Sequence, residues 1–184
     1  VKASIGKTVT VVVVSVLVKK YVLKMPGLSF DNVLMINTLA TIGGFAIYDL
    51  FIYKLNDKTN LKGSGKAAWK DVLKFGSMMI GKELILSHYN GVELSVNKLK
   101  NIGIGLLGFV LYDLLILPNQ PKLATTSSYK QDAFSDTIKT VIAFIINDLI
   151  PDRDIEIGSL PTIFSLLIAV PIYHLVVNPI IKKK

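Results

Sequence analysis

Three long apolar blocks constrain this chain more than any other feature of its sequence. They cover residues 32–53, 99–117 and 160–181. Each is close to the roughly 20 residues that an α-helix needs to cross about 30 Å of hydrocarbon. None alternates strictly between apolar and polar residues, as the strands of a membrane barrel do. They are also apolar nearly all round, unlike a soluble amphipathic helix. The sequence therefore predicts three transmembrane helices.

Three other blocks, over residues 8–23, 67–86 and 133–150, are less apolar and carry charges. The first contains TVTVVVVSVLV, whose β-branched residues also fit a strand, although an isolated strand leaves its backbone groups unpaired in lipid. These blocks either cross the membrane, lie at its surface or re-enter from one side. We expect one all-α domain over residues 1–184, a polytopic transmembrane helix bundle with three strong and three weaker helices and up to six crossings.

The strong and weak blocks recur as an internal repeat. GFAIYDLFI at 44–52 matches GFVLYDLLI at 108–116, with six of nine residues identical and an offset of 64. AWKD at 68–71 matches AFSD at 133–136, and a lysine stands three residues after each aspartate. A weaker third copy, AVPIYHL at 169–175, has histidine in the place of the aspartate. The pattern predicts a parallel two-helix repeat of about 64 residues, over 5–54, 67–117 and 132–182, and three copies can pack around a pseudo-threefold axis.

The charge distribution favours lipid as a partner and gives an orientation. The chain carries 21 basic and 13 acidic residues, and its lysines flank the apolar blocks without an interleaved aromatic patch of the kind that binds nucleic acid. If all six blocks cross, twelve lysines share one side with both termini, against six basic residues on the other side. The positive-inside rule then predicts cytosolic N- and C-termini.

Several polar residues lie within or beside the apolar blocks and are candidates for function. The intramembrane positions are Asp49, Asp113 and His174, each preceded by a tyrosine, at Tyr48, Tyr112 and Tyr173. A carboxylate in the bilayer interior costs a few kcal/mol, so it commonly faces protein or water and has a function. The same residues near a helix end also fit interface anchors beside aromatic side chains. Candidate ion pairs at i, i+3 spacing join Asp71 to Lys74 and Asp136 to Lys139, as a self-neutralising stripe or a hydrophilic path.

No constellation predicts catalysis, a metal or a cofactor. The two histidines, His88 and His174, stand on different blocks without ligands at metal spacing, and the absence of cysteine removes disulfide and thiolate chemistry. Gly63-Ser64-Gly65-Lys66 lacks the full phosphate-loop pattern, so we expect a flexible lysine-rich loop there. The chain offers no nucleophile set for an enzyme acting on lipid.

Two kinds of function fit these features. The first is a structural membrane protein that anchors or scaffolds a larger assembly, for which the membrane beneath a virus capsid shell is one setting. Its candidate contacts with partner proteins or headgroups are Lys58, Lys62, Lys66, Lys182, Lys183 and Lys184. The alternative is a small ion or proton channel or a transporter that uses the intramembrane aspartates.

Overall fold

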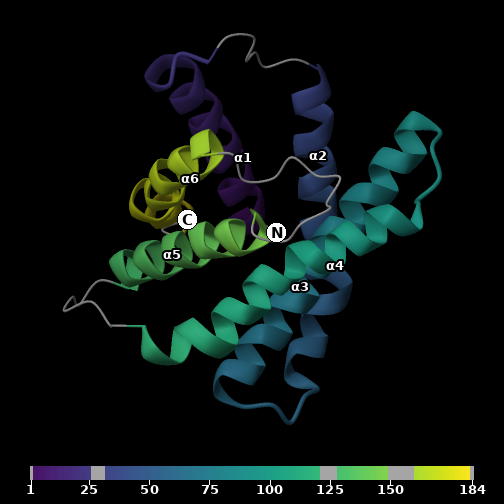
Figure 1. The fold of residues 1–184 in the computed structure, drawn as a ribbon, viewed down its shortest axis with the longest axis vertical. Helices are drawn as coiled ribbons and strands as arrows, with labels where there is room; N and C mark the ends of the chain where they lie inside the picture. Colours follow the sequence, from purple (N-terminus) through teal and green to yellow (C-terminus); the bar gives the residue numbers. More distant parts are fainter. Residues whose placement is uncertain (1, 26–31, 121–127, 149–159, 183–184) are drawn as a thin grey trace.

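The computed structural model describes residues 2–25, 32–120, 128–148 and 160–182, and this part of the chain is all α-helical (Figure 1). The predicted all-α class is therefore confirmed. Six helices make up the bundle: α1 Lys2–Leu17, α2 Asn32–Ile47, α3 Gly63–Asn90, α4 Val96–Leu111, α5 Ser128–Asp148 and α6 Leu160–Ile172. The short helix α7, Asn178–Lys182, ends the described chain.

Helices α2, α4 and α6 each continue into a π-helical turn of five residues. The turns are η2 Tyr48–Ile52, η4 Tyr112–Ile116 and η6 Tyr173–Val177, so each begins at the tyrosine of the sequence motif. Two of them run on into 3₁₀ turns, η3 Tyr53–Asp57 and η5 Leu117–Asn119. A fourth π-helical turn, η1 Val18–Val22, extends α1. Single π-helical turns are rare and occur frequently at functional sites.

The three strong blocks form three helices long and apolar enough to cross a membrane. They run continuously over Asn32–Asp57, Val96–Asn119 and Leu160–Lys182. Within the most apolar part of each span, only 17%, 39% and 33% of the residues are buried inside the protein. Their remaining apolar surface lies on the outside of the bundle, where lipid rather than water suits it. The spans indicate an integral membrane protein in contact with a bilayer.

The three weaker blocks are also helical. The β-branched run that also fitted a strand lies within α1, so the strand alternative is wrong. The helix propensity of valine is only slightly low, and tertiary packing overrides it: Val16 and Val18 are buried. The expected loop at Gly63–Lys66 is wrong as well, because these residues form the first turn of α3.

The helices close into a ring. Each of the helices α1 to α6 packs against the next in the chain, and α6 packs against α1 (Figure 1). The start of α1 meets the end of the chain, since a Cβ at Gly6 would collide with Ile181. The starts of α1, α3 and α5 thus lie at the same end of the bundle as the π-helical turns after α2, α4 and α6. Helices α1, α3 and α5 therefore run in roughly the opposite direction to α2, α4 and α6. This arrangement brings the polar motifs of all six helices close to the same end of the bundle.

The tightest helix contact joins α2 to α3. A Cβ added at Gly44 would collide with the backbone carbonyl of Met78, and one at Gly81 would lie 2.9 Å from the Cα of Gly44. Ala40, one turn before Gly44, is also buried. Small residues at this spacing let helix backbones approach closely in membranes.

Candidate functional site

A cluster of ion pairs joins the helices near the end of the bundle where the termini meet. At its centre Lys139 of α5 contacts two carboxylates at once. Its ammonium donates to Asp113 of η4 over 2.8 Å and pairs with Asp71 of α3. The Asp113 side chain has no exposed surface, and those of Lys139 and Asp71 are 17% and 15% exposed. One lysine therefore links α3, η4 and α5.

Asp136 of α5 forms the second half of the cluster. Its Oδ2 lies 2.6 Å from the Lys7 ammonium of α1 and 2.8 Å from Nε2 of His174 in η6. Lys7 and Asp136 are 129 residues apart in the sequence, so this contact joins the first and last thirds of the chain. The ion pair therefore helps to close the ring of helices.

The remaining candidate carboxylate, Asp49 of η2, meets the first helix. The Ser4 hydroxyl donates to its Oδ2 over 3.1 Å. Asp49 is half-buried, whereas Asp113 and His174 are buried. All three intramembrane positions singled out in the sequence thus face neighbouring helices of the bundle.

The i, i+3 pairs are replaced by pairs between helices. Lys139 stands three residues after Asp136, yet the structure pairs Lys139 with Asp71 and Asp113, while Asp136 pairs with Lys7 and His174. Helical spacing puts residues i and i+3 on one face. Here that face meets other helices, so Asp71, Asp136 and Lys139 each pair with a residue of another helix.

The three motif tyrosines are buried, and two of them bond to the chain that follows. Asn56 donates to the Tyr48 hydroxyl over 2.6 Å, and the Tyr112 hydroxyl donates to Gln120. Tyr48, Tyr112 and Tyr173 are 5%, 1% and 4% exposed. They are thus buried supports of the cluster rather than exposed interface residues.

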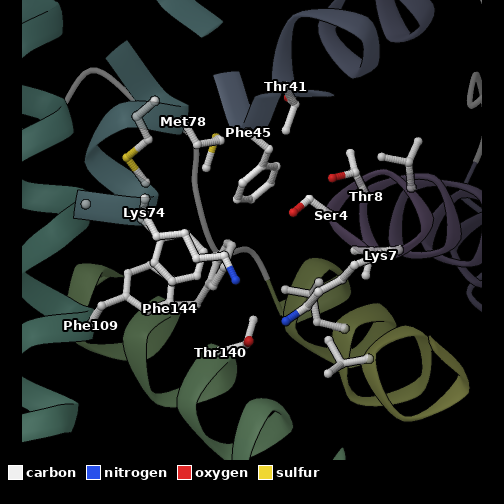
Figure 2. A pocket seen from close by; sticks show the side chains of 17 residues that line it. Ser4, Lys7, Thr8, Thr41, Phe45, Lys74, Met78, Phe109, Thr140 and Phe144 are labelled. Carbon is white, nitrogen blue, oxygen red and sulfur yellow. The ribbon is translucent and has the colours of Figure 1, made fainter. Parts of the chain in front are cut away.

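A cavity of about 340 Å³ lies next to the cluster, toward the middle of the bundle (Figure 2). Residues from all six helices line it, with Ser4 and Lys7 of α1, Phe45 of α2 and Lys74 of α3 among them. On α1 and α3 the lining residues continue on the C-terminal side of the two lysines, and on the even helices they precede the π-helical turns. The cluster therefore caps the cavity at the end that holds the termini.

Lys74 differs from the other two interior lysines. Among the described residues, no carboxylate forms a salt bridge with it; its ammonium lies 6.0 Å and 5.8 Å from the ring centroids of Phe45 and Phe75. Figure 2 shows this ammonium and that of Lys7 pointing into the same space. The two charged side chains of the described lining are these lysines.

The other candidate residues lie away from the cluster. Lys58, Lys62 and Lys182 are exposed, Lys66 pairs with Asp57 at 3.3 Å, and the Lys182 ammonium lies 5.3 Å from the Tyr129 ring centroid. His88 is exposed on the last turns of α3. Lys183 and Lys184 lie outside the described residues.

Sequence reasoning did not single out Ser4 or Lys7 as site residues. Ser4 and Lys7 stand three residues apart, as do Asp71 and Lys74, and Asp136 and Lys139. This spacing could have identified Ser4 and Lys7, but a serine stands where the other two copies have an aspartate.

Comparison of the chain with models of protein families, with curated proteins and with solved structures gives no match.

Proposed function

We propose that this protein is a small membrane transporter or channel in which three equivalent helix pairs surround an axial solute site. One observation carries the proposal. The cavity is lined by all six helices and is capped by ion pairs that join all three helix pairs. Binding sites between the helices of a bundle have this form.

The lining supports the repeat, because matching positions of the three pairs meet at the cavity. Thr41, Gly105 and Leu166 follow the offsets of 64 and 61, and so do Phe45, Phe109 and Val170. On the odd helices, Thr8, Phe75 and Thr140 each stand one residue after the lysine of the motif. Three related sets around one cavity are what a pseudo-threefold axis through it produces.

The ion pairs follow the same cyclic order. Lys139 of the third pair contacts Asp71 of the second, and Lys7 of the first pair contacts Asp136 of the third. Lys74 of the second pair correspondingly lines the cavity with Ser4 of the first. Lys7 and Lys139 thus each contact the preceding pair, and the Lys74 ammonium lies 6.0 Å from the ring centroid of Phe45 on the preceding pair. This arrangement fits one rotational relationship applied three times.

The energetics favour a functional reading of the cluster over a purely structural one. Burying ions costs several kcal/mol each, and well-packed apolar residues of similar volume often stabilise a protein equally well or better. Ionisable residues within a membrane bundle commonly line a solute or ion path. Ion pairs between helices can also separate and re-form as the helices move, so the cluster is suited to gate the capped end.

A scaffold remains the second candidate, supported by the exposed lysines. Lys58, Lys62 and Lys182 lie at the end of the bundle where the termini meet, and they suit acidic partner proteins or anionic headgroups. We propose that this end faces the cytosol and that α1, α3 and α5 also cross the membrane. A scaffold that binds a protein layer does not by itself account for the capped cavity.

Electrical recording on proteoliposomes tests the proposed function. Small organic and inorganic ions of either charge are applied to the proteoliposomes. We expect the wild type to give a current with at least one of them. This current should be lost in Asp49→Asn/Asp113→Asn, because these substitutions remove the carboxylates that bond to Ser4 of α1 and to Lys139 of α5 at the capped end. Thermal unfolding of the same preparation shows whether the variant is folded. Asp57→Asn, which alters an exposed ion pair, is the matched control and should retain the current.

The scaffold predicts the opposite pattern. No solute would give a current, and neutralising Lys58, Lys62 and Lys182 would release proteins that co-purify with the wild type. That combination would overturn the transport proposal.

A further inference from the structure

We infer that the axial cavity binds an organic anion that carries one carboxylate on an apolar chain or ring, with Lys74 as the residue that pairs with the carboxylate. The inference rests on the proposed function, since this anion would be the transported solute. It also predicts binding, which is measured separately from transport.

The sign of the ligand charge follows from the lining. Among the described residues that line the cavity, the charged ones are Lys7 and Lys74, and none is acidic. Asp136 already pairs with Lys7 at 2.6 Å and also contacts His174. A cation would therefore face two ammonium groups, whereas an anion would meet one ammonium that has no direct carboxylate partner.

The state of Lys74 results from one residue difference between the helix pairs. Lys139 and Lys7 find Asp71 and Asp136 on the preceding pair. In the same cyclic order the counterpart of Asp71 is Ser4, which lines the cavity with Lys74 and holds no charge. The counterpart of Asp113 is Asp49, and it forms no salt bridge with Lys74 among the described residues. Ser4 donates its hydroxyl to Asp49 over 3.1 Å, and Asp71 on the helix of Lys74 is engaged by Lys139. A ligand carboxylate can therefore take the place of the aspartate that the first pair lacks.

The rest of the lining selects an apolar body for the ligand. Phe45, Phe75, Phe109, Met78 and Met79 contribute aromatic and thioether surface to the cavity that Lys74 lines. Two of these rings already lie within about 6 Å of that ammonium, where they attract it weakly. A volume of about 340 Å³ is at the lower end of the range for small-molecule sites. The lining suits a small amphipathic acid better than an inorganic anion, which would lose its hydration without polar replacement.

Calorimetric titration of the protein in a neutral maltoside detergent with octanoate tests this inference. We expect saturable binding of octanoate, and none of octylamine or 1-octanol at the same concentrations. Lys74→Met should weaken octanoate binding by about tenfold or more, because it removes a charge-assisted hydrogen bond. Lys70→Met is the matched control, since Lys70 is exposed one turn earlier on α3 and should leave binding unchanged.

A second variant keeps the test decisive if Lys74→Met does not fold. Ser4→Asp places a carboxylate in the position that the other two pairs fill with aspartate, so it should pair with Lys74 and compete with octanoate. Ser4→Asn, of similar size and without charge, should bind octanoate nearly as the wild type does. Equal octanoate affinity in Ser4→Asp and Ser4→Asn, or tighter binding of octylamine than of octanoate, would overturn the inference.

Two further comparisons complete the test. The first identifies the source of the ligand, and the second distinguishes failure of the anion site from failure of the proposed transport. Oleate offered from the bilayer and octanoate offered from water distinguish a membrane acid from a soluble one, and saturable binding of either supports the site. Octanoate binding that depends on Lys74, without any current in proteoliposomes, would refute transport and retain the site. Currents carried by cations alone would retain transport and refute the anion site.

Discussion

Lys139 donates to Asp113 over 2.8 Å, from α5 to the π-helical turn after α4, and the Asp113 side chain has no exposed surface. Asp71 shares the same ammonium. Such a pair contributes less through its own attraction than through the cost of leaving either member alone, because desolvation has already removed the water that would stabilise a lone charge.

Replacing Lys139 by methionine should therefore destabilise the protein severely. The change leaves Asp71 and Asp113 close together without a counter-charge, and breaking a buried pair in this way costs about 3–5 kcal/mol. The loss of stability is measured as a lower melting temperature of the detergent-solubilised protein. Lys66→Met is the control, because Lys66 pairs with an Asp57 side chain that is 74% exposed and such pairs contribute at most about 1 kcal/mol. Adding Asp113→Asn to Lys139→Met should restore part of the lost stability. Equal melting temperatures for Lys139→Met and Lys66→Met would contradict the prediction.

Lys7 and Asp136 should be energetically coupled although 129 residues separate them. The Lys7 ammonium nitrogen lies 2.6 Å from Asp136 Oδ2. Residues in one ion-pair network show coupling energies of about 0.5–3 kcal/mol. A double-mutant cycle of Lys7→Gln and Asp136→Asn, followed by chemical unfolding, measures the coupling. Parallel cycles between Lys7→Gln and Asp57→Asn should be additive. Additivity in both cycles would mean that the first and third helix pairs do not meet at this contact.

The architecture of this protein was largely accessible from its sequence, and its charge pairing was not. Length and composition located the three spans, since the requirement to cross hydrocarbon leaves few alternatives. The fate of Asp136 and Lys139 depends instead on which helices their shared face meets, which is a tertiary property. Helical spacing alone suggested that the two pair with each other, but each pairs with residues of other helices.

The cavity could not be predicted from the sequence either, because polar, small and apolar residues stand at corresponding positions of its lining. Thr41, Gly105 and Leu166 share no property that a periodicity would detect, yet all three line it. The offsets of the predicted repeat relate them, but those offsets point to a common cavity only when the closed ring of helices is known. The β-branched run in α1 failed as a strand signal for a related reason, since packing within the bundle overrides local propensity.

Gly44→Ala should weaken the contact between α2 and α3. The new Cβ would collide with the Met78 carbonyl, which is backbone and can retreat only if the helices separate. Overpacking of this kind costs about 1–3 kcal/mol, measured as a lower melting temperature. Gly103→Ala is the matched control, because a Cβ there meets nothing within 4 Å. It should be neutral or should stabilise α4 by up to about 1 kcal/mol, since alanine is the better helix former. A melting temperature for Gly44→Ala equal to that of Gly103→Ala would show that the two helices do not approach this closely.

Six crossings should place the two ends of α3 on opposite sides of the membrane. The chain contains no cysteine, so single cysteines introduced at exposed positions report their own side through a membrane-impermeant maleimide. Lys58→Cys and Lys182→Cys should be labelled only after the cytosolic face is opened, because both lie at the lysine-rich end. Glu93→Cys, in the turn between α3 and α4, should be labelled in intact cells. At 28 residues α3 is long enough to span about 30 Å of hydrocarbon, and its two carboxylates, Asp71 and Glu83, pair with Lys139 and Lys98 of other helices. Labelling of Lys58→Cys and Glu93→Cys from the same side would show that α3 does not cross, and the axial arrangement of three membrane-spanning helix pairs would then be wrong.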